Sequence, residues 1–258
     1  MLKALNIKLY PNNEQINYLS QIFGCYRKVY NLCLSESKKQ YEENNESNFC
    51  SLPSFSNYFH KTLLKEEDLF YLKDHNTKIL KDSINNLNIA FKNFFKHESG
   101  YPNFKKRSNE QKIGLYKEAF SKKIFNVENK IFISKKFGQI KYRTSDEYSK
   151  LIEKYKNNIQ RVTIKKTKSG EYFARILIDT QFEDNKQLNK PKNDIIGIDL
   201  GIKDFVITSE GETYENIKIK RNNKDKLAKL HREVSRRKKG GSNRNKSRKK
   251  LAKYYEKL

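Results

Sequence analysis

The order of apolar and polar residues predicts a strand followed by a long helix at the start of the chain. Residues 2–10 alternate between apolar and polar positions, which is the pattern of a strand with one buried face. Asn12 is followed three residues later by Gln15, a spacing typical of a helix N-cap and its capping-box partner. Apolar residues then recur at helical spacing, so we expect a helix over residues 13–41.

More helices are expected up to residue 100. Shorter helical patterns cover residues 53–64 and 66–72, and the longest apolar stripe covers residues 76–97. Gly100 and Pro102 follow this stripe, and both residue types are common just beyond a helix C-terminus. The pattern therefore predicts a helical segment that ends near residue 100.

After residue 110 the pattern changes to an alternation of period two. Many short antiparallel strands joined by tight turns indicate a small barrel or sandwich. The strand at residues 2–10 has no partner nearby in the sequence, so we expect it to join this later sheet, which makes residues 13–100 a helical insertion. One helix, residues 146–156, interrupts the strands. The strands are expected at residues 113–120, 123–127, 130–134, 138–142, 159–167 and 171–180.

The most apolar stretch, residues 194–208, carries one carboxylate of special interest. Asp199 lies in a predicted strand with Gly197 and Gly201 on its own face. An unpartnered buried carboxylate is costly, and glycine in a strand indicates the close approach of a backbone or a ligand. A bound metal ion accounts for both features, and so does a sheet-end aspartate bonded to backbone N–H groups. The expected strands are residues 195–200, 205–208 and, after a turn at 210–212, 213–219.

The end of the chain is the most basic part. A polar linker is expected at residues 181–193. Residues 217–258 hold 18 Lys or Arg and 3 Asp or Glu, so their net charge is +15. Amphipathic spacing predicts a helix over residues 224–237 and a second one from about residue 244. The second helix is expected to bury Leu251, Ala252 and Tyr255.

The whole chain of 258 residues has a net charge of +25, from 55 basic and 30 acidic residues. A polyanionic partner relieves such an excess, so nucleic acid is the first candidate and an anionic membrane surface the second. No apolar run approaches the roughly 20 residues that span a bilayer. The first residues are too polar for a signal peptide, and we expect a cytoplasmic protein with no membrane partner.

The three cysteines are widely spaced and form no Cys-x-x-Cys pair, which argues against a disulfide framework and a zinc site. Cys25 and Cys33 fall on the first predicted helix and are expected in its core.

Basic residues that suit a phosphate backbone lie on the polar face of the first helix, in the loop at residues 102–108 and in the turn at residues 236–241. A merely solvated loop explains residues 102–108 equally well. The candidate nucleic-acid contacts are Arg27, Lys28, Lys105, Lys106, Arg107, Arg236, Arg237, Lys238, Lys239 and Arg244.

Four stretches together resemble, in the family's own order, the TnpB (OrfB) family of small insertion sequences, the relatives of the type V CRISPR effectors. Lys8–Asn12 resembles the family's opening, and Ala90–Phe95 followed by Pro-x-Phe-Lys resembles a middle motif. Gly197–Phe205 resembles the first RuvC-like motif, and Val234–Ser242 a later Ser-Arg-basic-Lys-Gly-Ser motif. Each motif is weak alone, whereas the ordered set is specific.

This resemblance implies an α+β fold with a wedge-like antiparallel β-barrel formed by residues 1–12 and 101–190. Residues 13–100 become a helical recognition insertion, and residues 191–258 become the N-terminal part of a RuvC-like nuclease domain of RNase H-like α/β fold. The implied partners are a guide RNA and a target DNA that base pairing selects.

The resemblance also implies a catalytic site. Family members hold two divalent metal ions, expected to be Mg²⁺, with three acidic residues, and Asp199 matches the first acid as a catalytic residue and metal ligand. The second and third acids and the family's Zn²⁺-binding cysteine pairs have no match in residues 1–258. From sequence we therefore expect a truncated chain without a complete nuclease site, or a repurposed RNA-guided DNA binder without nuclease activity.

Two rival interpretations come from other classes. An actin- or Hsp70-like ATPase also has a Gly-x-Asp-x-Gly strand pair, but it usually places Thr or Ser where this chain has Ile202. A general basic RNA binder explains the charge and leaves the strand around Asp199 unexplained.

Overall fold

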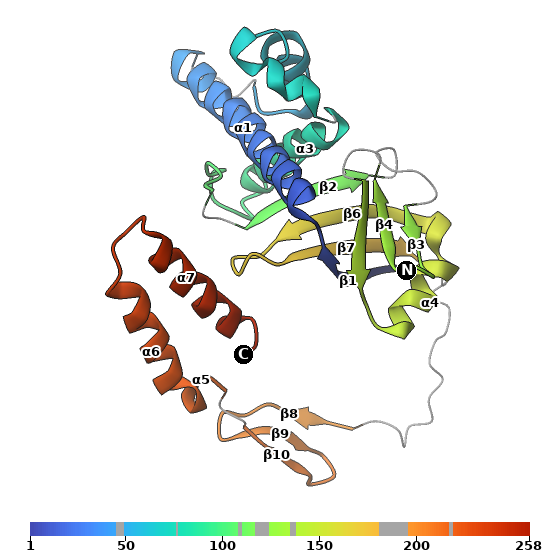
Figure 1. The fold of residues 1–258 in the computed structure, drawn as a ribbon, viewed down its shortest axis with the longest axis vertical. Helices are drawn as coiled ribbons and strands as arrows, with labels where there is room; N and C mark the ends of the chain where they lie inside the picture. Colours follow the sequence, from blue (N-terminus) through green and yellow to red (C-terminus); the bar gives the residue numbers. More distant parts are fainter. Residues whose placement is uncertain are drawn as a thin grey trace. The chain divides into compact units, whose positions relative to one another are not determined.

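The computed structural model describes residues 1–44, 49–75, 77–107, 110–116, 124–134, 138–180, 196–216 and 219–258. The chain divides into two compact units, Met1–Gln181 and Phe182–Leu258. The first unit contains a seven-stranded sheet and a group of helices, and the second contains a three-stranded sheet and a helical hairpin (Figure 1). The fold is thus mixed α+β, as expected.

All strand pairs of the first unit are antiparallel, in the order β2-β6-β7-β1-β5-β4-β3. In Figure 1, β4 runs across the direction of β6 and β7, so the sheet is strongly curled. The strands are β1 (Leu2–Tyr10), β2 (Gln111–Tyr116), β3 (Phe125–Asn126), β4 (Ile131–Ser134), β5 (Gly138–Arg143), β6 (Ile159–Lys166) and β7 (Tyr172–Asp179).

The described strands form a curled antiparallel half-barrel, which is the coarser form of the wedge-like β-barrel that we expected. Among the described residues its edge strands, β2 and β3, pair with β6 and β4 and not with each other. The predicted continuation of β2 over residues 117–120 lies outside the described residues.

The N-terminal strand lies in the middle of this sheet, which confirms the expectation that it joins the later strands. It pairs with β7 from Leu2↔Asp179 to Leu9↔Tyr172 and with β5 from Lys8↔Arg143 to Tyr10↔Lys141. One face of the sheet is buried under alternating apolar side chains. Its core includes Leu5, Ile7, Leu9, Ile113, Phe132, Ile140, Val162, Ile164, Ala174 and Ile176.

Every element that the structure describes between β1 and β2 is helical. α1 begins with a complete capping box, since the Asn12 N–H donates to Gln15 Oε1 (2.9 Å) and the Gln15 N–H donates to Asn12 Oδ1 (2.8 Å). Cys25 and Cys33 are buried on this helix, as predicted. The helices are α1 (Asn13–Asn44), α2 (Leu52–Tyr58), the π-helix η1 (Phe59–Leu63), the 3₁₀ helix η2 (Glu67–Asp74) and α3 (Thr77–Phe95).

α3 ends earlier than expected, at Phe95, and His97 rather than Gly100 or Pro102 terminates it. His97 adopts the left-handed conformation, with φ at 60°. The next N–H group, of Glu98, donates to the carbonyl oxygen of Asn93 at 2.9 Å, the six-to-one bond typical of a helix C-terminus of this kind. A short α-helix, α4 (Asp146–Lys154), and a 3₁₀ turn, η4 (Lys156–Asn158), join β5 to β6.

The second unit begins, after residues outside the described part, with an antiparallel sheet in the order β10-β9-β8. The predicted linker, residues 181–193, lies outside the described residues. The third strand is shorter than the predicted 213–219, because a helix begins at Ile219. The elements are β8 (Ile198–Asp199), β9 (Asp204–Thr208), β10 (Thr213–Glu215), α5 (Ile219–Asn222), α6 (Lys224–Ser235) and α7 (Ser242–Tyr255).

α6 and α7 form a hairpin with a thin core. Leu230 is buried, whereas Leu251 and Ala252, which were expected to be buried, are half-buried. Tyr255 was expected to be buried but is 49% exposed, and it hydrogen-bonds His231 Nε2 through its hydroxyl at 2.9 Å. The neighbouring Tyr254 is half-buried instead, with its hydroxyl on Asn223 Oδ1. Across the ranges described above, no helix has the length and apolar character needed to cross a membrane.

Candidate nucleic-acid interface and metal ligand

Asp199 lies on β8, in a sheet whose apolar side chains are exposed. It pairs with Ile207, and its neighbours Ile198 and Leu200 are 64% and 71% exposed. Asp199 is itself exposed. The expectation of a buried carboxylate is therefore wrong. A strand of two residues in a three-stranded sheet cannot bury its side chains without a second layer, and the high exposures show that the described residues of this unit provide none.

A backbone contact explains one of the two glycines around Asp199, Gly201, whereas Gly197 has room for a Cβ atom beside Ser209. A Cβ atom on Gly201 would lie 2.8 Å from the carbonyl oxygen of Asp204, which is closer than side chains tolerate. The Gly197 N–H donates to Ser209 Oγ at 3.0 Å, and the Ser209 N–H donates back to the Gly197 carbonyl at 2.8 Å. Sequence left open whether a backbone or a ligand approaches these glycines, and at Gly201 the approaching group is backbone.

The described residues do not fit a two-metal centre by themselves. No group of three or more His, Cys, Asp or Glu side chains converges in the part of the chain that the structure describes. Asp199 is a single exposed carboxylate, whereas a centre of two divalent ions needs several oxygen ligands. Its predicted role as a catalytic residue and metal ligand therefore stays a prediction.

The basic turn between α6 and α7 is built as expected. Arg236, Arg237, Lys238 and Lys239 are exposed, and Gly240 reverses the chain with φ at 84°, a conformation that favours glycine. Arg244, in the first turn of α7, is half-buried. This hairpin places four unshielded cations side by side in the sequence and provides one candidate surface for a phosphate backbone.

The basic residues predicted on α1 and in the loop at residues 102–107 separate into two kinds. Lys28, Lys106 and Arg107 are exposed. Arg27 is half-buried, and its Nη1 donates to Gln111 Oε1 at 2.9 Å. Lys105 turns inward.

Asn31 hydrogen-bonds both backbone polar groups of Lys105, the N–H and the carbonyl. The Lys105 N–H donates to Asn31 Oδ1 at 2.8 Å, and Asn31 Nδ2 donates to the Lys105 carbonyl at 3.0 Å. Its ammonium lies 3.8 Å from the ring centroid of Tyr30 and 5.2 Å from that of Tyr26. Burial, with a smaller contribution from Lys112, lowers the pKa of Lys105 to about 8. Lys105 is therefore a positioned, partly desolvated cation rather than a flexible surface lysine.

The outward face of β1, β7, β6 and β2 is a second basic surface, and the sequence analysis missed it. Lys112 lies opposite Lys165 on β6, and Arg175 on β7 lies between Asn6 and Thr163. These residues share one face because directly paired antiparallel residues point the same way. We call this surface the polar sheet face. It comprises Asn6, Lys8, Lys112, Arg161, Thr163, Lys165 and Arg175.

Alternation within β6 could have revealed this surface, since Arg161, Thr163 and Lys165 alternate with the buried Val162 and Ile164. That alternation predicted only the buried side of the strand.

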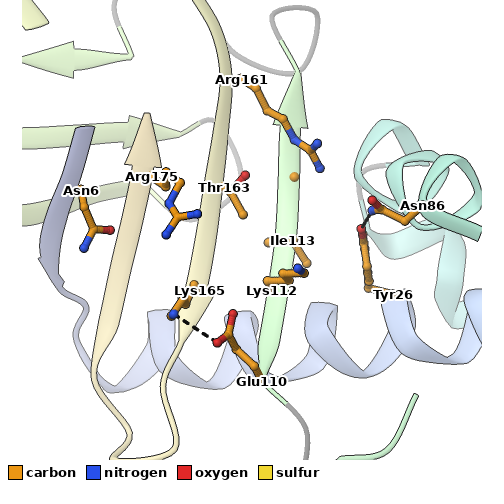
Figure 2. A pocket seen from close by; sticks show the side chains of 11 residues that line it. Asn6, Tyr26, Asn86, Glu110, Lys112, Ile113, Arg161, Thr163, Lys165 and Arg175 are labelled. Atoms are coloured by element: carbon orange, nitrogen blue, oxygen red, sulfur yellow. Dashed lines mark hydrogen bonds and ion pairs between the residues drawn. The ribbon is translucent and has the colours of Figure 1, made fainter. Parts of the chain in front are cut away.

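A pocket of about 190 Å³ opens on the polar sheet face beside the helices (Figure 2). Figure 2 shows Arg175 and Thr163 on neighbouring strands, with Tyr26 and Asn86 reaching in from the helical side. Four cations line the pocket, and its single carboxylate, Glu110, is already paired with Lys165 at 3.1 Å. The excess of positive charge favours a phosphate-bearing ligand. The four cations are Lys112, Arg161, Lys165 and Arg175.

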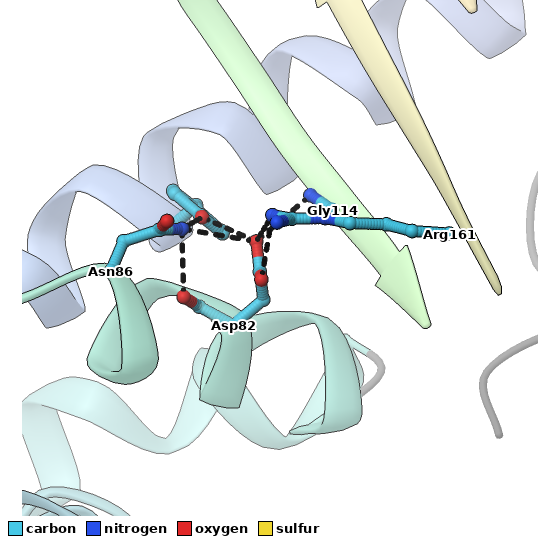
Figure 3. Close-up of polar contacts among 5 residues, drawn as sticks. Asp82, Asn86, Gly114 and Arg161 are labelled. Carbon is cyan, nitrogen blue, oxygen red and sulfur yellow. Dashed lines mark hydrogen bonds and ion pairs between the residues drawn. The ribbon is translucent and has the colours of Figure 1, made fainter. Parts of the chain in front are cut away.

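A buried carboxylate behind this pocket fixes the helices against the sheet (Figure 3). Asp82 of α3 is 1% exposed and accepts hydrogen bonds from Tyr26 Oη (2.6 Å), the Gly114 N–H (3.0 Å) and Arg161 Nη2 (2.9 Å). Asn86 Nδ2 donates to the Asp82 carbonyl at 2.8 Å and also to Tyr26 Oη. A Cβ atom on Gly114 would lie 2.4 Å from Asp82 Oδ2. Four elements, α1, α3, β2 and β6, therefore meet at one carboxylate.

The apolar stripe of α3 predicted the helix but not this polar network. The available signal was an acidic residue, Asp82, within the buried side of an amphipathic helix, with Asn86 one turn later.

Two family profiles match the chain. The IS605 OrfB profile described as "Helix-turn-helix domain" matches residues 1–46, and the one described as "Probable transposase" matches residues 177–258. Up to Asn44 the first match consists of the strand β1 and one continuous helix, α1, rather than two helices joined by a turn.

Two longer proteins are similar over nearly the whole chain. A "Putative RNA-guided DNA endonuclease" of Streptomyces pristinaespiralis is 29% identical over 258 residues, which cover 99% of this chain and 60% of that protein. The "Putative RNA-guided DNA endonuclease InsQ" of Escherichia coli (strain K12) is 25% identical over 250 residues, which cover 97% of this chain and 58% of that protein. The chain thus spans about three fifths of the length of these relatives.

Two further matches are more limited. The "Virulence protein VsdF" of Salmonella dublin is 30% identical over 114 residues, which cover 42% of this chain and 95% of that protein. Among solved structures, a CRISPR-Cas12f ternary complex aligns with a TM-score of 0.42 at 16% identity, over 93% of this chain and 58% of that one.

Proposed function

Because the chain belongs to the IS605 OrfB/TnpB family, we propose that it is the nucleic-acid-binding portion of an RNA-guided DNA endonuclease. In this proposal a guide RNA bound to the protein selects the target DNA by base pairing, and the protein contacts backbones rather than reading sequence. A protein with this role would act in the prokaryotic cytoplasm, at the nucleoid.

The observation that carries the proposal is the concentration of unmatched positive charge on built surfaces. The polar sheet face gathers Lys112 and Arg175 around a pocket whose only lining carboxylate, Glu110, is already paired with Lys165. The turn between α6 and α7 adds four exposed cations in the second unit. Neutralising backbone phosphates releases counterions, which makes such surfaces bind nucleic acid in a salt-dependent way.

We propose the same division of the chain that the resemblance implies. Residues 1–12 and 101–190 form the wedge-like barrel, residues 13–100 the helical recognition insertion, and residues 191–258 the start of the RuvC-like domain. The curled sheet with helices inserted after β1, and the exposed three-stranded sheet that carries Asp199, support this division.

For the metal, we propose that Asp199 supplies one ligand to Mg²⁺ in the family's nuclease centre, where the ions would stabilise the attacking and leaving oxygens of the phosphodiester. The described residues hold only this carboxylate at the site, so no cleavage step follows from them. We therefore propose that residues 1–258 bind guide RNA and DNA without cutting DNA on their own.

RNA sequencing tests the proposal. The 258-residue chain would be expressed together with the DNA that flanks its own gene, purified at moderate salt, and the bound RNA sequenced. We expect one structured transcript from the flanking DNA to be enriched many-fold over bulk cellular RNA. As a matched control, a Lys165→Glu/Arg175→Glu variant should lose most of that RNA while it keeps the unfolding transition of the wild type. A bound-RNA profile equal to bulk RNA would refute guided recognition and favour a general RNA binder.

A further inference from the structure

A second pocket, of about 210 Å³, lies next to the one on the polar sheet face, between α1, the loop at residues 102–107 and the start of β2. The two pockets share Tyr26, Glu110 and Lys112 as lining residues. The second pocket takes its cations from three separate segments of the chain. They are Arg27 of α1, Lys105 and Lys106 of the loop, and Lys112 of β2.

Across the described ranges, none of these four cations forms an ion pair. The one carboxylate in the lining, Glu110, is engaged by Lys165, which lies outside this pocket. Asp82 favours the charged form of Lys105, but burial and the charge of Lys112 outweigh it, so the pKa of Lys105 is lowered. Lys112 is close enough for its charge to lower the pKa of Lys105. An anion in the pocket would relieve this repulsion.

Two of the cations in the pocket, Lys105 and Arg27, are held in place by neighbouring residues. Asn31 holds the backbone of Lys105 by two hydrogen bonds, and the rings of Tyr26 and Tyr30 support its side chain. Arg27 is oriented by its bond to Gln111. Groups fixed before binding lose less conformational freedom when a ligand arrives, so their contacts are worth more.

We propose that this pocket is a phosphodiester-binding site, in which one backbone phosphate of a nucleic acid strand is held by Arg27, Lys105, Lys106 and Lys112. The inference rests on the proposed function and identifies one point where the strand is gripped. Arg27 offers several donors beyond the one that Gln111 uses, and the lysines act as point charges.

Occupation of this site is coupled to a proton on Lys105. The pKa of Lys105 in the free protein is about 8, and a neighbouring phosphate favours the charged ammonium and raises that pKa. Above pH 8 the bound state therefore holds more protons than the free state, and affinity falls as pH rises, by up to about tenfold per pH unit for one proton. The other charged or titratable groups around Lys105 are Arg27, Lys106, Lys112, Glu110, Asp82, Tyr26 and Tyr30.

The two phenols beside Lys105 do not account for a change between pH 7.5 and 9.5. Burial raises the pKa values of Tyr26 and Tyr30 above the usual 10, so both phenols stay neutral over this range.

The test measures affinity by fluorescence anisotropy with two labelled probes, a single-stranded oligouridylate and a DNA duplex, each at constant salt from pH 7.5 to 9.5. Lys105→Met removes the charge and keeps the side-chain length, and Lys105→Arg keeps the charge at every pH. Lys61→Met removes an exposed lysine that does not line the pocket, as the matched control. Thermal unfolding of each variant checks its fold.

We expect Lys105→Met and Lys106→Met each to weaken binding about tenfold at pH 7.5, and Lys61→Met to change it less than twofold. Wild-type affinity should fall above pH 8, whereas that of Lys105→Arg should stay level. The probe with the larger loss identifies whether the gripped strand is RNA or DNA.

A wild-type affinity that is level from pH 7.5 to 9.5, or a Lys105→Met variant that binds like Lys61→Met, would overturn the proposal. In that case tight binding by all variants would leave the proposed function intact, whereas absence of binding to both probes would refute the function as well.

Discussion

Replacing Asp82 by alanine should destabilise the joint between the helices and the sheet. The substitution removes the acceptor shared by Tyr26, Gly114 and Arg161. Breaking a buried ion pair by deleting one partner costs about 3–5 kcal/mol, mainly because the remaining charge is left uncompensated. The Arg161 side chain is 28% exposed, so water can partly solvate it, which favours the lower end, about 3 kcal/mol. A loss of this size is a large fraction of a typical stability.

Urea titration read by hydrogen-exchange mass spectrometry measures this loss. Peptides from α3 and β2 report on the first unit alone, which matters because two units can unfold in separate transitions. The control is the double variant Asp82→Ala/Arg161→Met, which removes both charges. We expect it to be 1–2 kcal/mol more stable than the single variant, as is usual for directly coupled residues, roughly 0.5–3 kcal/mol. A cost below about 1 kcal/mol for Asp82→Ala, or a double variant no more stable than the single one, would contradict the assigned role.

Three further predictions concern the start of α1, the second unit and the buried thiols. Asn12→Ala removes the acceptor of the first-turn N–H at 2.8 Å and should lower the free energy of unfolding by about 1 kcal/mol in chemical denaturation, whereas an unchanged value would mean that the capping box contributes nothing. Asp199→Ala should change the free energy of unfolding by less than about 0.5 kcal/mol, because Asp199 is exposed. The same substitution should leave RNA affinity unchanged. Mg²⁺-dependent nicking of plasmid DNA by the wild-type 258-residue chain would contradict the proposed lack of cleavage. Burial raises the pKa of Cys33 to about 12, so at pH 8 iodoacetamide should modify Cys33 far more slowly than the half-exposed Cys50, as peptide mass spectrometry would show, and equal rates would refute the burial of Cys33.

The sequence predicted the elements well because their signals are local. The capping box at Asn12 and Gln15, the strand at residues 2–10 and the apolar stripe of α3 each depend on residues within a few positions of one another. Period-two alternation also identified the strands of the sheet. The C-terminus of α3 was predicted too late for a local reason as well. His97 adopts the left-handed conformation that ends the helix, and this conformation is usually predicted from a glycine.

The site was harder to predict because it depends on register between distant segments. Lys112 and Lys165 become neighbours only through the pairing of β2 with β6, and Asp82 meets Arg161 across 79 residues. The basic loop was read as a set of equivalent surface charges, and nothing in its sequence indicates that Lys105 turns inward while Lys106 stays exposed. Charge and family motifs thus pointed to the kind of ligand, whereas the residues that form the pockets required the fold.

The central position of β1 has a consequence for the order of synthesis. Its residue Leu2 pairs with Asp179, so a strand that leaves the ribosome first waits for partners made 177 residues later. At about 5–20 residues per second, that interval is roughly 9–35 s. Within this interval only β5, which pairs with the last residues of β1, becomes available as a partner, and the remaining apolar residues of β1 are available to chaperones or to other nascent chains. The sheet can therefore form only after most of the first unit has been translated, and deleting the first ten residues would remove its middle strand rather than trim an edge.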